Sequence, residues 1–320
     1  MTSPRVSVII PTYNGNLWLS QAIDSVISQT FKDFEIIIID DGSTEPIINN
    51  FQNEPRLLFI RQENAGTSAA RNRGISISRG DYIAFLDHDD LWLPNKLQKQ
   101  VNLLDKYSQV GFTFCDYISL CNDTSRPNGF SRGTISKLSV DEPEAGVFLI
   151  KNETVFNYLL DDLFVQIPST WMIRRKILLD TGGFNSLLRR GGEDIYLALI
   201  LSTRCKFAFH GAPMTQRREF PQSLSAKNNW KEEFLLTLDI IYKQQNLGPL
   251  EQQILFKRRK KFAENLARDD IATGNYGKAI KKLSIALEGK QSLNRTTLAN
   301  YLLLVIALIK NRIKKTYPNK

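Results

Sequence analysis

The stretch DYIAFLDHDDLW, residues 81–92, places a short apolar run directly before Asp87, Asp89 and Asp90. A continuous apolar run of this length is typical of a strand that is buried on both faces of a sheet. Three carboxylates at the end of one strand repel each other unless a positive group lies among them. The stretch therefore predicts a buried strand that ends at a charged site.

The same pattern recurs through the first half of the chain. Apolar runs rich in β-branched residues alternate with amphipathic segments, which predicts an α/β fold with a mostly parallel, Rossmann-like sheet covered by helices on both faces. In such folds ligands bind beyond the carboxyl ends of the strands. We expect strands at residues 5–11, 34–40, 56–60, 81–87 and 110–116, and helices at 17–29, 67–78 and 93–108.

The rest of the chain changes character twice. Residues 116–144 lose periodicity and gather Asn, Ser, Gly, Pro and Asp, which indicates a long surface excursion. Order returns with a strand and helix in 166–184, a helix opening on Glu193 and Asp194, and a strand at 206–210. After residue 225 the pattern is helical, and 262–288 resembles one tetratricopeptide hairpin. We predict a domain at 1–225, with halves 1–115 and 116–225, and a helical region at 226–320.

The positive charge is confined to the C-terminal region. The chain carries a net charge of +9, whereas residues 226–320 hold 19 Lys and Arg against 8 Asp and Glu, a net charge of +11. An anionic membrane would suit such a surface, and a solvated helical face is the alternative. We expect no nucleic acid partner, because the basic residues match no binding motif and lack interleaved aromatic residues.

Several features point to the cytoplasm. No signal peptide is visible, and three cysteines without CxxC spacing indicate core thiols in a reducing compartment. The longest apolar stretch, 298–309, falls short of the roughly 20 residues that span a bilayer. We therefore expect a cytoplasmic protein, with a peripheral position on the inner face of the cell membrane. A nucleotide hydrolase or a dehydrogenase is disfavoured, since no glycine-rich phosphate loop is present.

The carboxylates at the strand ends suggest metal chemistry. An Asp-x-Asp pair can hold Mg²⁺ or Mn²⁺, which usually share their coordination with substrate phosphates. The alternative is a helix N-cap, because Asp90 precedes a helical segment. The expected strand order brings Asp41, Asp87, Asp89 and Asp194 to one crevice.

Six motifs occur in a fixed order between residues 6 and 225: VSVIIPTYN, DDGST, NAGTSAARNRG, GDYIAFLDHDD, GGFN and GGED. Together they resemble the family 2 glycosyltransferases, inverting enzymes of the GT-A fold that use nucleotide-diphosphate sugars. The resemblance implies transfer from a sugar nucleotide, with UDP expected, to a hydroxyl of a glycan or lipid-linked saccharide in cell-surface or exopolysaccharide synthesis. It assigns the donor to residues 1–115 and the acceptor to 116–225.

The resemblance also assigns the donor-side residues. Asp41 would accept a hydrogen bond from the uracil imide, and Arg71 would position the nucleotide or its phosphates, with an ion pair to a nearby carboxylate as the alternative. The alternating position of His88, in contrast, suggests that it points away from the metal side, as a packing or ribose-side residue. The base pocket would be lined by Pro11, Thr12 and Tyr13.

The reacting centre follows from the same resemblance. Asp89 would bind the divalent cation, Mn²⁺ or Mg²⁺, and Asp87 would lie near the ribose and the metal-bound waters. Asp194 would be the general base that takes the acceptor proton, with a helix N-cap as the alternative. Glu193 would bind acceptor hydroxyls or pair with Arg189 or Arg190.

The chain also departs from the family pattern. Phe220 occupies a place where many relatives carry a histidine, which leaves a third protein ligand for the metal in doubt. Arg217 or Arg218 could contact the diphosphate instead, and a charged surface loop is the equal alternative. The non-enzyme alternative is an inactive relative that binds a glycan or a partner, although the presence of Asp41, Asp89 and Asp194 argues against it.

Overall fold

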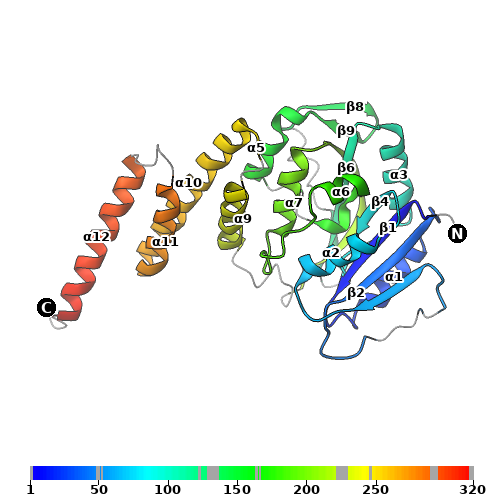
Figure 1. Ribbon diagram of the computed structural model, residues 1–320, viewed down its shortest axis with the longest axis horizontal. Helices are drawn as coiled ribbons and strands as arrows, with labels where there is room; N and C mark the ends of the chain where they lie inside the picture. Colours follow the sequence, from blue (N-terminus) through cyan, green and yellow to red (C-terminus); the bar gives the residue numbers. More distant parts are fainter. Residues whose placement is uncertain are drawn as a thin grey trace. The chain divides into compact units, whose positions relative to one another are not determined.

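The computed structural model describes residues 3–47, 51, 53–121, 124–127, 137–162, 165, 167–220, 230–244, 247–288 and 295–316. These residues form two compact units, which divide between Asn228 and Asn229. The first unit contains the sheet and the second contains only helices among its described residues (Figure 1). None of the described helices combines the length and the apolar character that crossing a bilayer requires.

The first unit is built on one mixed sheet. Its strands are β1 (Val6–Thr12), β2 (Phe34–Asp40), β3 (Leu57–Arg61), β4 (Tyr82–Phe85), β5 (Leu91–Trp92), β6 (Val110–Cys121), β7 (Thr124–Pro127), β8 (Val140–Glu144), β9 (Val147–Ile150), β10 (Met172–Arg174) and β11 (Lys206–Arg218). Its helices are α1 (Leu19–Ile27), α2 (Thr67–Ile77), α3 (Lys96–Lys106), α5 (Asn152–Asp162), the 3₁₀ turn η2 (Pro168–Thr170), α6 (Arg175–Asp180) and α7 (Glu193–Ser202).

The strand order places the loops of the first half together. Along the sheet the order is β3-β2-β1-β4-β10-β6-β11-β9-β8, and the first four strands are parallel. Beyond β4 the sheet is mixed, since β10 runs antiparallel to both β4 and β6, whereas β11 is parallel to β6. The predicted α/β class is confirmed. The carboxyl ends of β1, β2 and β4 therefore meet at one edge.

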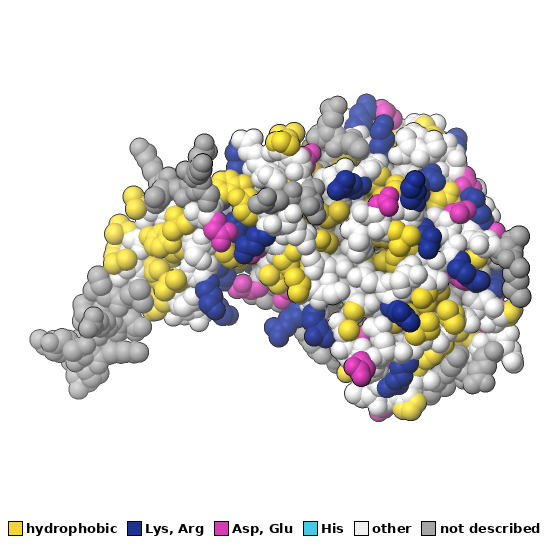
Figure 2. Space-filling model, viewed as in Figure 1, with side chains coloured by type: hydrophobic (Ala, Val, Ile, Leu, Met, Phe, Trp, Pro, Cys, Tyr) yellow, Lys and Arg dark blue, Asp and Glu magenta, His cyan; other side chains and the backbone are white. Residues whose placement is uncertain are grey.

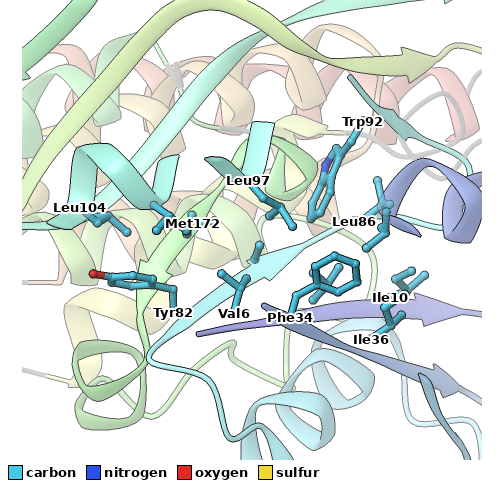
Figure 3. Close-up of a cluster of buried hydrophobic side chains, with 14 of the residues drawn as sticks. Val6, Ile10, Phe34, Ile36, Tyr82, Leu86, Trp92, Leu97, Leu104 and Met172 are labelled. Atoms are coloured by element: carbon cyan, nitrogen blue, oxygen red, sulfur yellow. The ribbon is translucent and has the colours of Figure 1, made fainter. Parts of the chain in front are cut away.

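Alternation along the strands divides the core between the two faces of the sheet. On one face, side chains such as Val6, Ile10 and Phe34 pack against Leu97 of α3 and other residues of α1 and α3 (Figure 3). On the other face, Ile37 and Ile39 pack against Ala70 of α2. Burying each such aliphatic side chain contributes about 1.5–3 kcal/mol. Continuous apolar strands were therefore a sound signal for a sheet covered on both faces.

The predicted excursion at 116–144 is only partly irregular. The strand β6 continues to Cys121, β7 pairs back onto it in antiparallel register, and β8 begins at Val140. Polar composition concealed these strands because they lie where the sheet extends beyond the central core. Part of the predicted excursion, residues 122–123 and 128–136, lies outside the described residues.

The second unit consists of α9 (Trp230–Gln244), α10 (Pro249–Ala272), α11 (Tyr276–Leu287) and α12 (Arg295–Thr316). The helix hairpin expected at 262–288 is present, with Gly274 at φ +79° in its turn. Its small residues Ala267 and Ala279 are fully buried together with Leu283. The buried Arg259 pairs with Asp239 and Glu288, so the helices are also joined by charge.

Candidate active site

The loops that follow β1 and β2 are tied to each other. The amide of Asp41 donates to the carbonyl of Thr12 (2.8 Å). The amide of Asn14 donates to Ser43 Oγ (2.9 Å), and Asn14 Oδ1 accepts from the amide of Thr44 (2.9 Å). Asn14 has φ +54°, a left-handed conformation that asparagine tolerates better than most residues. The sequence analysis missed this role of Asn14, although its place in the turn-like YNGN was a usable signal.

The donor-side residues differ in exposure at this edge. Pro11 and Thr12 are buried, whereas Tyr13 is 45% exposed. A side chain on Gly15 would collide with Thr12 Oγ1 and with the ring of His88, so the His88 ring lies against the Gly15 backbone. The structure thus brings Thr12, the last residue of β1, and His88, in the loop after β4, to the same glycine.

The carboxylate of Asp41 organises the loop after β3. It accepts hydrogen bonds from Gln62 Nε2 (2.8 Å) and from the amides of Ala65 (2.9 Å) and Gly66 (2.8 Å). Asp41 is only 4% exposed, and Gly66 is the residue from which α2 begins. An ionised carboxylate offers about four acceptor sites. Three are used by the chain, which leaves room for one further donor.

Arg71 on α2 joins the acidic loop after β4 to the start of α7. Its Nη2 lies 2.7 Å from Asp87 Oδ1, its Nη1 lies 2.9 Å from Glu193 Oε1, and its guanidinium lies 5.0 Å from the centre of the Phe184 ring. Burial alone would lower the pKa of Arg71, but the two carboxylates raise it above its ordinary value. The structure shows the ion pair that was the alternative for Arg71. It also gives Glu193 a partner, Arg71, that the sequence did not suggest, since Arg189 or Arg190 was expected to pair with Glu193.

The acidic loop closes on itself. The amide of Asp90 donates to the carbonyl of Asp87 (3.0 Å). Ser169 Oγ accepts from the amide of Asp87 (3.0 Å) and donates to Asp90 Oδ2 (2.6 Å). Sequence reasoning missed Ser169, since nothing in the chain relates it to residues some 80 positions earlier.

The expected helix cap by Asp90 is wrong. The helix α3 begins at Lys96, with Asn95 as its N-cap residue, and Asp90 instead precedes the short strand β5. Asp90 Oδ1 accepts a hydrogen bond from the backbone amide of Arg218 (3.2 Å). The side chain of Arg218 donates through Nη1 to the carbonyl of Asp89 (2.8 Å). Asp90 therefore fastens the loop to β11 and η2.

The acidic loop fits a divalent cation only if substrate supplies further ligands. The described residues contain no group of three His, Cys, Asp or Glu side chains placed to hold a metal by themselves. Burial raises the pKa of Asp89, and the charge of Asp87 raises it further. His88 and Arg217 act in the opposite direction on this pKa, and a bound cation would stabilise the ionised carboxylate further. Mg²⁺ and Mn²⁺ commonly combine one or two carboxylates with substrate phosphates.

Asp194 lies in the first turn of α7. The N-cap residue of this helix is Gly192, at φ +83°, so the alternative that Asp194 is the cap is wrong. Burial, followed by the charge of Glu193, raises the pKa of Asp194 to about 8. Its Oδ1 accepts from the amide of Ile195 (2.7 Å). Among the described contacts, Asp194 meets neither Asp41 nor Asp89 directly, and Arg71 supplies the link between the two loops.

Other aromatic side chains of this unit belong to the core or pack on another ring. Trp92 is 4% exposed and Trp171 is fully buried, so neither presents a face to a sugar. Phe220 packs on Trp18, with ring centres 4.6 Å apart. Arg218 uses one guanidinium nitrogen to hold the carbonyl of Asp89.

A sheet with an acidic loop after a parallel strand, joined through Arg71 to a helix that begins with two acidic residues, forms a GT-A-like fold. The fold is similar to that of S. aureus TarS residues 1–349 in crystals with UDP-GlcNAc, with a TM-score of 0.66 and 17% identity over 96% of this chain and 88% of that chain. A second TarS structure, in complex with UDP, gives a TM-score of 0.62, also at 17% identity, over 95% of this chain and 88% of that chain. These likenesses show the fold alone.

The model of glycosyl transferase family 2 matches residues 7–182, more than half of the chain. The protein therefore belongs to glycosyl transferase family 2. It is 41% identical to an uncharacterized glycosyltransferase of Rickettsia typhi over 119 residues, which are 36% of this chain and 37% of that protein. It is also 41% identical to an uncharacterized glycosyltransferase of Haemophilus influenzae over 125 residues, 36% of this chain and 50% of that protein. The chain thus spans half or less of the length of these relatives.

Proposed function

We propose that this glycosyltransferase moves a sugar from a UDP-sugar to an acceptor hydroxyl with inversion, assisted by Mn²⁺ or Mg²⁺, in the synthesis of a cell-surface or exopolysaccharide glycan. The observation that carries the proposal is the ion-paired group of Arg71, Asp87 and Glu193. It brings the acidic loop after β4 to the helix start that carries Asp194. Donor-side and acceptor-side carboxylates thereby belong to one site.

The donor proposal rests on the edge formed by β1 and β2. Asp41 has one acceptor site left, and the imide N–H of uracil is a donor that could use it. Tyr13 is exposed beside this edge and offers a ring for stacking on a base. The TarS structures with UDP and UDP-GlcNAc, which share the fold, support a UDP-sugar over other nucleotide sugars.

The chemistry divides between two carboxylates. Asp194 would accept the proton of the acceptor hydroxyl as its oxygen attacks the anomeric carbon from the side opposite the leaving diphosphate, which inverts the configuration. A pKa of about 8 makes Asp194 a stronger base than an ordinary aspartate once it is ionised. Asp89, with Asp87 beside it, would hold the divalent cation. When bound, the cation supplies positive charge to the departing diphosphate.

The acceptor proposal is a glycan or a lipid-linked saccharide, and a lipid anchor would bring the enzyme to a membrane. The segment 289–320 contains seven Lys and Arg and no Asp or Glu. In α12, Leu304 is buried, whereas Leu298, Leu302 and Val305 are 62%, 60% and 49% exposed. Figure 2 shows hydrophobic side chains on the surface of the C-terminal helices. We therefore propose that α12 contacts the anionic inner face of the cell membrane, as an interfacial helix would.

The test is a screen of nucleotide sugars for release of the nucleoside diphosphate, with and without Mn²⁺, alongside titration of UDP. We expect one UDP-sugar to be turned over, with activity lost in Asp89→Ala and with UDP binding retained in Asp194→Asn. Release from a different class of nucleotide sugar would overturn the UDP assignment. Binding of UDP that is indifferent to Mn²⁺ would overturn the role of Asp89.

A further inference from the structure

The acidic loop is held by a residue of the other half of the unit. Ser169 is fully buried on η2, and its hydroxyl makes two bonds at once, since it accepts from the amide of Asp87 (3.0 Å) and donates to Asp90 Oδ2 (2.6 Å). These two bonds span both ends of the four-residue loop that contains Asp89. Ser169 therefore holds both ends of the acidic loop through hydrogen bonds of its neutral hydroxyl and adds no negative charge to it.

The backbone that carries Ser169 is itself fixed by buried side chains. The carbonyl of Ser169 accepts from Trp92 Nε1 (2.7 Å) and Thr215 Oγ1 (3.1 Å), and the next carbonyl, of Thr170, accepts from Gln100 Nε2 (2.9 Å). The donors come from β5, β11 and α3. The position of η2 is thus determined from three sides.

A buried lysine completes this group. Lys96 Nζ donates to Gln100 Oε1 (2.7 Å) and lies 4.0 Å from the centre of the Trp92 ring. Lys96 is fully buried, and among the described residues no carboxylate pairs with it. Its bond to the amide oxygen orients Gln100, so that the amide nitrogen faces Thr170. Lys96 Nζ also donates to the carbonyl of Trp171 (3.4 Å), so the lysine is bonded to both Gln100 and Trp171.

We propose that Ser169 is a positioning residue that sets the geometry of the Asp87–Asp90 loop for the divalent cation, an inference that rests on the proposed function. Asp87, Asp89 and Asp90 repel one another, and among the described ion pairs Arg71 neutralises only Asp87 of these three. The hydroxyl of Ser169 holds Asp90 and the amide of Asp87 in place, and Asp89 lies between them. Partners of metal ligands typically change metal affinity by about 10- to 100-fold when they are removed.

The experiment uses the full chain and measures UDP binding by calorimetry across a Mn²⁺ titration. Ser169→Ala should raise the Mn²⁺ concentration for half-maximal UDP binding at least about tenfold. In the transfer assay it should raise the activation constant for Mn²⁺ more than it lowers kcat at saturating Mn²⁺. Ser202→Ala is the matched control, because Ser202 is a buried serine whose hydroxyl donates to Leu199 within α7. Melting temperature is recorded for every variant.

The outcomes are distinguishable. If the wild type binds UDP in a Mn²⁺-dependent way and Ser169→Ala has the same Mn²⁺ response, the positioning role is wrong while the proposed function stands. If the wild type shows no Mn²⁺ dependence, the proposed cation itself fails. Should Ser169→Ala not fold, Ser169→Cys keeps nearly the same volume with weaker hydrogen bonds, and an unchanged Mn²⁺ response in that variant also overturns the inference.

Discussion

The guanidinium of Arg71 lies 2.7 Å from the carboxylate of Asp87, 16 residues later in the chain, and both belong to the edge where the parallel strands end. The same guanidinium reaches Glu193, 122 residues away in sequence. The buried guanidinium of Arg71 therefore joins the acidic loop after β4 to the start of α7, and these two segments have different proposed roles. The structure shows these ion pairs, and a direct contact of Arg71 with phosphate stays a prediction.

Replacing Arg71 tests this link. In Arg71→Met the carboxylates of Asp87 and Glu193 lose their shared cation, and breaking a buried pair should cost about 3 kcal/mol in the free energy of unfolding. We expect kcat/KM for the donor to fall at least about 100-fold, because both loops shift. Arg73→Met, on the exposed side of the same helix, is the control. Wild-type activity in Arg71→Met would show that the two loops are positioned by other contacts.

The second prediction concerns the pH dependence of transfer. A general base must be ionised, so kcat/KM should rise with pH through about 8 and level off above it, since the pKa of Asp194 is raised to about 8. Asp194→Asn should lower kcat by about 10²- to 10⁴-fold and remove this acid limb. UDP affinity serves as the control and should stay near the wild-type value. An acid limb that persists in the variant would assign the base to another group.

The same pKa predicts a stability effect of definite sign. Between pH of about 4 and about 8 the folded protein holds a proton on Asp194 that the unfolded chain has lost. The stabilisation of the folded state by this proton is complete below a pH of about 4 and is lost as the pH rises through about 8. Asp194→Asn should therefore melt at a higher temperature than the wild type at pH 9, and the difference should shrink toward pH 4. A difference that is independent of pH would contradict the assigned shift.

The third feature open to mutation is Asp41. Both oxygens of Asp41 accept hydrogen bonds from the loop at Gln62 to Gly66. Asn at this position replaces one of these acceptor oxygens by a donor. We expect Asp41→Asn to weaken UDP binding at least about tenfold, through the loss of about 1.4 kcal/mol or more. Calorimetric titration with UDP measures this. Asp24→Asn, on the exposed side of α1, should bind UDP like the wild type.

The membrane proposal predicts recovery of the full chain with floating vesicles that contain anionic lipid, and little recovery with neutral vesicles or at high salt. Leu302→Gln should reduce this recovery several-fold, because it places an amide on the exposed apolar face of α12. Leu250→Gln changes an equally exposed leucine of α10 and is the matched control. If the wild type stays unbound at all lipid compositions, or if α12 instead mediates self-association in light scattering, the proposal is wrong.

Much of the first unit was predictable because its strands are buried on both faces. Continuous apolar runs such as Val6–Thr12 are typical of an interior strand, and the helical segments between them indicate crossovers on the faces of the sheet. The later strands were harder. The strands β7 and β8 are polar and short, and the register of β10 between β4 and β6 depends on pairing partners that are distant in sequence.

The sequence by itself determined the α/β class, the family and the acidic residues at the strand ends, because local apolar patterns and short motifs carry that information. Only the tertiary structure decided which group each acidic residue meets. In the structure Arg71 pairs with Asp87 and Glu193, and Ser169 donates to Asp90. Neither Asp90 nor Asp194 is a helix N-cap residue. These contacts join residues tens to more than a hundred positions apart, and burial then sets their strength, so no local pattern could specify them.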